Sequence, residues 1–260
     1  MKLLNLTKCV ICMFVALPIA QAATITVERV ANVPAASEDS VWESIEPTKV
    51  VLSSQIIAPP VGGGAVSQIH VQAVHDDEWF ALRLEWSDPT INQAVGVDRF
   101  RDAVAVGFPI TSEPTSPFMG DADHPVAIWQ WSANHQANTD GKGKFAVDYP
   151  KTDGVWYADH DAAMSLRVHR WRGVEPAEHF VAQGFGTLRP EPDNSLTGTG
   201  GWADGTWTVV LRRQLTSSAA PSFQPGASTQ MIIAVWDGGN NEVNGRKSIT
   251  MNWLPVNLEK

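Results

Sequence analysis

The chain has 260 residues, a formal net charge of −9 at pH 7, and 28 acidic against 19 basic residues. Such a surface argues against a nucleic-acid partner, because phosphate binding depends on clustered Lys and Arg side chains. The two cysteines, Cys9 and Cys12, both lie near the N-terminus. The sequence after them therefore offers no disulfide, thiolate-bound zinc, iron-sulfur cluster or Cys-x-x-Cys-His site for covalent haem.

Residues 1–22 are typical of a cleaved secretory signal peptide. Lys2 and Lys8 form a positive segment, Cys9 to Ala20 an apolar one, and Ala20-Gln21-Ala22 a small-x-small cleavage site. An uncleaved anchor is the alternative, but the apolar run is short for a bilayer span. We expect a mature chain with a formal charge of about −11, exported to the periplasm and without a membrane span.

Residues 23–260 predict one all-β domain, since no Pro/Ser/Gly-rich linker or internal repeat divides them. The clearest element is Trp79–Trp86, whose apolar side chains alternate with Arg83 and Glu85, as in a half-buried antiparallel strand. A cluster of turn residues separates it from a preceding strand at Gln68–Val74. Together they predict a β-hairpin.

Further segments rich in β-branched and aromatic residues predict the remaining strands. In chain order these are Thr24–Val30, Lys49–Leu52, Asp102–Phe108, Val126–Trp131, Met164–Trp171, Glu178–Ala182, Thr208–Arg213, Thr229–Trp236 and Ser248–Trp253. The Gly/Thr/Asn-rich stretch before Trp202 predicts a loop, and Asp204-Gly205 predicts a tight turn. The polar segment 132–157 predicts a long loop with little regular structure. About ten short strands without a helical period favour an antiparallel β-sandwich.

The stretch Ser116–Trp131 places Met119 in a Gly/Asp/Pro loop directly before a tryptophan-rich strand. A methionine in this position is either a gap filler under the loop or a thioether ligand. Other methionines fall in strand patterns and are interpreted as core residues: Met164, Met231 and Met251. His124, five residues after Met119, is a rival ligand, because histidine is the commonest metal ligand among side chains.

The eleven tryptophans are explained most simply by packing in a large sandwich. An alternative is a secreted carbohydrate-binding module, in which sugar rings would stack on Trp79, Trp129 or Trp202. A hydrolase would need catalytic carboxylates, and the adjacent acidic pairs are better explained as turn residues. These pairs are Asp76/Asp77 and Asp121/Asp123.

Four segments, in this order, resemble the gamma subunit of the ethylbenzene dehydrogenase, dimethylsulfide dehydrogenase, chlorate reductase and selenate reductase family. They are PFMGDADHPVAIWQW at 117–131, AQGFGTLRP at 182–190, WADGTWTVVLRR at 202–213 and IIAVWDGGNNEVNGRKSITMNWLPV at 232–256. The resemblance covers almost all of the mature chain, least of all 132–157. It implies an antiparallel β-sandwich, immunoglobulin-like or DOMON-like with long loops, that holds one non-covalent haem b.

The resemblance also implies that one methionine and one lysine are the axial ligands of the haem iron. On this sequence they correspond to Met119 and to Lys247 of the motif Gly245-Arg246-Lys247-Ser248. Arg246 is our candidate for contacting the haem propionates, and His124 stays a rival for one axial position. With both positions filled by protein, such a centre moves electrons and leaves no open site for oxygen or substrate.

The function that the resemblance implies is that of a periplasmic electron-transfer subunit, non-catalytic by itself. Its partners would be a catalytic alpha subunit with a molybdenum cofactor and an iron-sulfur beta subunit, in a heterotrimer. It would relay electrons between the iron-sulfur subunit and a soluble c-type cytochrome. The substrate of such a complex is a property of the alpha chain.

Overall fold

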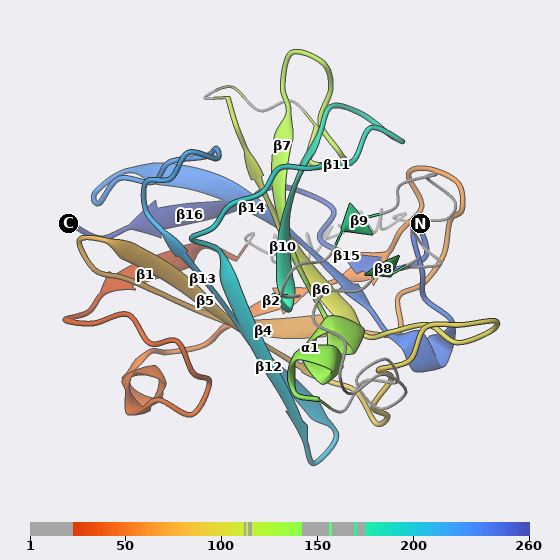
Figure 1. Ribbon diagram of the computed structural model, residues 1–260. Coiled ribbons are helices and arrows are strands. Elements are labelled where there is room, and N and C mark those ends of the chain that lie inside the picture. The colour runs from red at the N-terminus through yellow and green to blue at the C-terminus, as the bar shows by residue number, and fades with distance from the viewer. Residues whose placement is uncertain (1–22, 112, 114–115, 142–155, 158–168, 171–174) are drawn as a thin grey trace, which may run out of the picture.

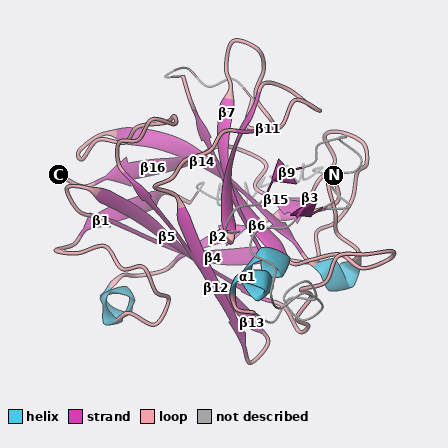
Figure 2. Cartoon of the chain, viewed as in Figure 1, coloured by secondary structure: helices cyan, strands magenta, loops and turns pink. Residues whose placement is uncertain are grey.

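The computed structural model describes residues 23–111, 113, 116–141, 156–157, 169–170 and 175–260 (Figure 1). Strands dominate this part of the chain, as Figure 2 shows, and it contains one α-helix, α1 (Ala133–Thr139). Two 3-10 turns accompany it, η1 (Ser40–Ser44) and η2 (Gly238–Asn240). No helix within these ranges has the length and apolar character that a membrane span requires.

The first layer of the fold is built around the hairpin of β4 (Gln68–His75) and β5 (Trp79–Ser87). β5 also pairs with β13 (Thr206–Gln214), and β13 with β12 (Thr197–Ala203). On the other side, β2 (Thr48–Val51) pairs with β4. All these pairings are antiparallel, as the alternation in the sequence predicts.

The second layer is centred on β6 (Ala103–Pro109), which lies between β7 (Val126–Ser132) and β14 (Ser228–Trp236). β7 pairs with β10 (Ala177–Ala182), which carries the short β11 (Arg189–Pro190). β15 (Ser248–Ile249) joins β14 to β3 (Ser53–Ser54). A separate pair is formed by β8 (Trp156–Tyr157) and β9 (His169–Arg170).

One strand connects the two layers into a continuous sheet that folds back on itself. β1 (Ile25–Arg29) pairs in parallel with β4 of the first layer and with β16 (Leu254–Leu258), which pairs with β14 of the second. The expected β-sandwich is confirmed, and β1 is the exception to its antiparallel pairing. In Figure 1 the strands β12, β13 and β5 run across the view in a different direction from β7 and β10.

Aromatic side chains from both layers meet in the core. The ring centroid of Phe80 on β5 lies 6.3 Å from that of Phe108 on β6 and 5.9 Å from that of Trp129 on β7. Trp131 on β7 contacts Trp207 on β13 at 5.0 Å. All five are at least 99% buried, so core packing explains these tryptophans.

Three expectations about secondary structure are wrong. The loop predicted for 132–157 begins instead with α1, whose Gln136 Oε1 accepts hydrogen bonds from Trp131 Nε1 at 3.1 Å and from the Gly200 amide at 2.9 Å. The glycine-rich stretch before Trp202 is not a loop but β12. Of the strand predicted at Ser248–Trp253, only Ser248–Ile249 forms a strand, β15. The chain then turns before it forms β16.

Other predictions fall outside the described residues. The signal peptide at 1–22 is one of them, and the loop at 142–155 is another. Of the strand predicted at Met164–Trp171, the structure describes only β9.

Candidate functional site

Most of the second layer's face that is turned away from the core is apolar. The register aligns Phe180, Ile128, Gly107 and Ile232 in one row across β10, β7, β6 and β14. In the next row Ala105 and Ala234 lie beside the polar Gln130 and Glu178. On β6, β7 and β14 the alternate residues point into the core. We call the six apolar residues of these two rows the outer apolar face. Ile128, Phe180, Ile232 and Ala234 remain partly exposed, which is unusual for adjoining apolar side chains on a sheet.

Small residues leave the middle of the outer apolar face without protruding side chains. A Cβ atom at Gly107 would lie 2.8 Å from Ile232 Cγ1, and its neighbour Ala105 ends at a methyl group. On the β10 side the face becomes polar at Glu178, whose carboxylate lies 3.5 Å from His135 Nδ1. A shallow apolar floor with polar groups at its margin is suited to a flat, largely apolar ligand.

Lys247 stands at one end of this face, directly before β15. Its Nζ lies 4.8 Å from the ring centroid of Trp236, the outward-facing last residue of β14. Within the described residues no carboxylate is within ion-pair distance of this ammonium group. Burial lowers the pKa of Lys247 to about 8. The side chain therefore gives up its proton more readily than an ordinary lysine, and a neutral amine can bind a metal.

The backbone of Lys247 is held by the loop that follows β3. Its N–H donates to the Gly62 carbonyl at 3.1 Å, and its carbonyl accepts from the Gln55 N–H at 3.1 Å. Gly63 has φ +90°, and a Cβ atom there would lie 2.3 Å from the Lys247 nitrogen. The close approach thus requires glycine. Arg246 is exposed beside this loop, with its backbone N–H bonded to the Val243 carbonyl at 3.0 Å.

Met119 lies at the opposite end of the second layer, in the loop between β6 and β7. Its backbone is left-handed, with φ +64°, and its carbonyl accepts from the Gly184 N–H at 2.8 Å. Such conformations are costly for residues other than glycine and cluster at binding sites. Val126 and Ser132 mark the two ends of β7 and are six residues apart, so the Met119 end and the Lys247 end are separated by about 20 Å along the strands.

The structure therefore does not bring Met119 and Lys247 into contact. It places them at opposite ends of the layer that carries the outer apolar face. His124, the rival ligand, has its ring Nδ1 2.9 Å from Asp121 Oδ1. The same carboxylate oxygen accepts from the backbone N–H groups of Asp123 and His124, so Asp121 is a turn residue, as the sequence indicates.

The tryptophans considered for sugar stacking have other roles. Trp129 is fully buried in the core. The guanidinium carbon of Arg212 lies 3.6 Å from the ring centroid of Trp79, and Trp202 Nε1 donates to the Asp88 carbonyl at 3.0 Å. They therefore form no common exposed platform.

The outer apolar face was not identified from the sequence. Its residues are spaced like those of any buried strand, and their common row exists only once four strands are in register. One signal was present, namely the small residues Ala103, Ala105 and Gly107 at alternate positions of one predicted strand.

Comparisons with known proteins agree with the resemblance in the sequence. A family model described as ethylbenzene dehydrogenase matches residues 39–248. Chlorate reductase subunit gamma of Ideonella dechloratans is 31% identical over 239 residues, which cover 88% of this chain and 82% of that protein. Dimethylsulfide dehydrogenase subunit gamma of Rhodovulum sulfidophilum is 26% identical, with 84% of this chain and 72% of that protein covered.

Two further proteins are similar to the chain. The putative respiratory nitrate reductase heme subunit ORF7 of Haloferax mediterranei is 25% identical and covers 93% of this chain and 78% of its own length. Among solved structures, a family 9 carbohydrate binding module from Caldicellulosiruptor kristjanssonii in complex with cellotriose aligns with a TM-score of 0.48 and 10% identity. That alignment covers 91% of this chain and 93% of the module.

Proposed function

Because the chain belongs to the ethylbenzene dehydrogenase family, we propose that it is a non-catalytic, haem b-binding electron-transfer subunit of an oxidoreductase complex. The observation that carries the proposal is the environment of the Lys247 side chain. A lysine with a lowered pKa, no carboxylate partner among the described residues and a place at the end of an apolar face has the properties of a metal ligand. A relative named as a heme subunit supports the choice of cofactor.

The residues that would hold the haem are the outer apolar face, Met119, Lys247 and Arg246. The apolar face would exclude water from the ring, and Arg246 would offer its guanidinium to the propionates. Bound there, haem b would supply a one-electron iron couple. Lys247 would ligate as the neutral amine, so its lowered pKa reduces the cost of losing the proton. The Met119 thioether would favour the ferrous state.

The distance between the Met119 end and the Lys247 end of the second layer limits how these two residues could ligate one iron together. Since about 20 Å exceeds the combined reach of a methionine and a lysine side chain, joint ligation requires the 116–125 loop to lie over the outer apolar face. His124 belongs to the same loop and stays the rival ligand to Met119. The two axial positions must therefore be tested separately.

We further propose a periplasmic location and a heterotrimer with a molybdenum-cofactor alpha subunit and an iron-sulfur beta subunit. The gamma-subunit names of two relatives support a multi-subunit complex. A chain with no cysteine after Cys12 depends on another subunit for iron-sulfur clusters, which supports a relay role. A soluble c-type cytochrome, whose surface would be basic where it meets this acidic chain, is the proposed redox partner.

The test is the visible absorption spectrum of the purified protein, oxidised and then reduced with dithionite. We expect sharp bands of a low-spin b-type haem that acid acetone extracts. Lys247→Ala and Met119→Ala should each lose or shift these bands, whereas the matched controls Lys49→Ala and Met251→Ala should not. A protein that stays colourless with added haemin would overturn the proposal.

His124→Ala separates the two possible ligand pairs. An unchanged spectrum in this variant, with a changed one in Met119→Ala, supports methionine as the ligand. The reverse result contradicts the assignment of Met119 and leaves the electron-transfer function in place.

A further inference from the structure

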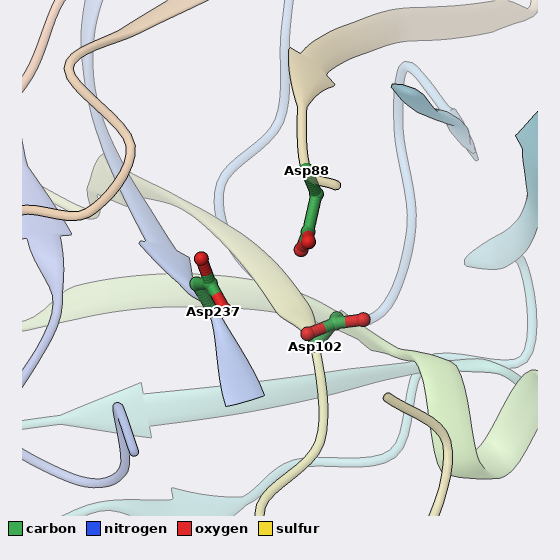
Figure 3. Close-up of side chains that lie close together, drawn as sticks. All are labelled: Asp88, Asp102 and Asp237. Atoms are coloured by element: carbon green, nitrogen blue, oxygen red, sulfur yellow. The ribbon is translucent and has the colours of Figure 1, made fainter. Parts of the chain in front are cut away.

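Three aspartates that are distant in the sequence meet at the ends of three strands. Asp88 directly follows β5, Asp102 directly precedes β6, and Asp237 directly follows β14. One carboxylate oxygen of each lies within 4.8 Å of the others, and the three groups converge in Figure 3. Their exposed fractions are 0%, 0% and 3%. This acidic cluster joins the first layer to the second and has no part in the proposed haem site.

The hydrogen bonds of the acidic cluster leave one oxygen without a donor. Asp102 accepts from the Asn92 amide at 2.7 Å, Trp207 Nε1 at 3.0 Å and the Gly238 amide at 2.9 Å. Asp237 accepts from the backbone and the side chain of Asn240. Asp88 Oδ1 accepts from the Thr90 amide and hydroxyl, but its buried Oδ2 has no hydrogen-bond partner. The carboxyl group of Asp88 points toward the other two aspartates (Figure 3).

Within the described residues no lysine, arginine or histidine forms an ion pair with the acidic cluster. Three buried carboxylates without a cation are electrostatically unfavourable, because burial and mutual repulsion both oppose their ionisation. The cluster must therefore bind either a cation or a proton.

We propose that Asp88, Asp102 and Asp237 bind one Ca²⁺ ion. The donor set consists of hard carboxylate oxygens alone, which Ca²⁺ and Mg²⁺ prefer and which softer metals do not. Ca²⁺ accepts irregular sets of six to eight oxygens at about 2.3–2.6 Å, whereas Mg²⁺ requires a near-ideal octahedron. Three aspartates fixed by three different strands make an irregular set. Asp88 Oδ2, which has no hydrogen-bond partner, becomes a ligand of the ion.

Glu242, a further buried acid beside Asp237, is not a ligand in this proposal. Its two carboxylate oxygens accept from the Ala65 amide at 2.9 Å and from the Asp237 amide at 3.1 Å. It fixes the backbone at Asp237 and so positions that ligand. The Ca²⁺ ion then ties the end of β5 to β6 and β14, across the two layers of the sandwich.

The test uses the purified full-length mature protein, its calcium content measured by mass spectrometry and its melting temperature by calorimetry. We expect one Ca²⁺ per chain, removed by EGTA with a fall in melting temperature of about 5–10 °C, and recovered on adding Ca²⁺. Asp237→Asn should lose the bound ion and the response to EGTA. Asp204→Asn, in the exposed turn between β12 and β13, is the matched control and should keep both.

Two results would overturn the proposal. A protein without calcium, whose melting temperature is the same in EGTA and in millimolar Ca²⁺, would show that the acidic cluster holds a proton. Recovery with Mg²⁺ but not with Ca²⁺ would make the site a magnesium site. If Asp237→Asn does not fold, the response of the unmodified protein decides between these outcomes.

Discussion

At the scale of single residues, the buried Arg213 holds two loops together. It is fully buried, and its guanidinium donates to Asp193 and to the carbonyls of Ala219 and Pro221. Ser217 Oγ also donates to Asp193 Oδ2, at 2.9 Å. The ion pair therefore fixes the turn before β12 and the segment after β13. Removing one partner leaves an uncompensated buried charge.

Asp193→Asn should lower the free energy of unfolding at pH 7 by about 3–5 kcal/mol, since Arg213 would remain buried without its counter-ion. Burial by itself raises the pKa of Asp193, but the hydrogen bonds from Arg213 and Ser195 outweigh it and lower the pKa to about 2. Because the pKa is lowered in the folded state, ionised Asp193 stabilises the fold at pH values above 3.8, its pKa in the unfolded chain. This stabilisation is lost as the pH falls from 3.8 toward 2.

Urea unfolding at a series of pH values checks this prediction. The unmodified protein should lose stability steadily between pH 4 and pH 2. Asp193→Asn should show a smaller slope in that interval, and an identical slope would rule out Asp193 as the titrating group. Asp77→Asn is the control, because its ion pair with Arg29 is exposed and worth little.

At the scale of elements, the strand β12 is predicted as a loop from the sequence, and its packing explains why. Its glycines suggest a loop, but a Cβ atom at Gly200 would lie 2.3 Å from Cζ2 of Trp131 on β7. The fully buried indole occupies the space that a side chain on β12 would fill. Glycine is therefore required by packing between strands that are far apart in sequence, which no local pattern reveals.

Gly200→Ala should destabilise the protein by about 1–3 kcal/mol, because the added methyl group overpacks the indole of Trp131. Gly201→Ala is the matched control, since nothing lies within 4 Å of a Cβ atom there, and it should stay within about 0.5 kcal/mol. Thermal unfolding of both variants measures the difference. Equal effects would mean that backbone entropy, not the contact with Trp131, decides.

The outer apolar face leads to a prediction about the cofactor. Ile128→Gln places an amide on this partly exposed face and should weaken haem retention roughly tenfold, because the amide must be desolvated when the ring binds. The fold should tolerate the change. The haem content per chain, measured by the pyridine haemochrome method, checks this.

Val51→Gln, on the exposed side of β2, is the control for Ile128→Gln. Val51 is 69% exposed and distant from the outer apolar face in the strand order, so this variant should keep its full haem content. Equal losses in the two variants would contradict the assignment of the face as the binding surface.

At the scale of the whole molecule, the sequence predicted what is periodic and local. The β4–β5 hairpin follows from strict alternation and a turn, and the sandwich from many such strands. Met119 and Lys247 came from residue type, loop context and resemblance. The outer apolar face and the acidic cluster could not be predicted, because Asp88, Asp102 and Asp237 become neighbours only when the strand order is known.

Deleting residues 254–260 should abolish the folded state, although only seven residues are lost. β16 lies between β1 and β14, and the Glu259 carbonyl bonds His75 Nε2 at 3.0 Å, so the deletion leaves two strand edges open. Size-exclusion chromatography and circular dichroism should show an aggregated or unfolded chain. Deleting Lys260 alone is the control and should leave a monodisperse folded protein.

The parallel pairing of β1 with β16 also sets the order in which the protein can fold. Ile25 pairs with Val256, so the ladder of the first strand is completed only by β16, which is synthesised long after it. A nascent chain must therefore keep residues 25–27 of β1 unpaired until β16 emerges, although Glu28 and Arg29 can pair with β4 earlier. Contacts of such long sequence separation make folding slow, and the waiting strand edge is prone to aggregation. A chaperone that shields β1 during this interval should raise the yield of folded protein more than one that acts after release.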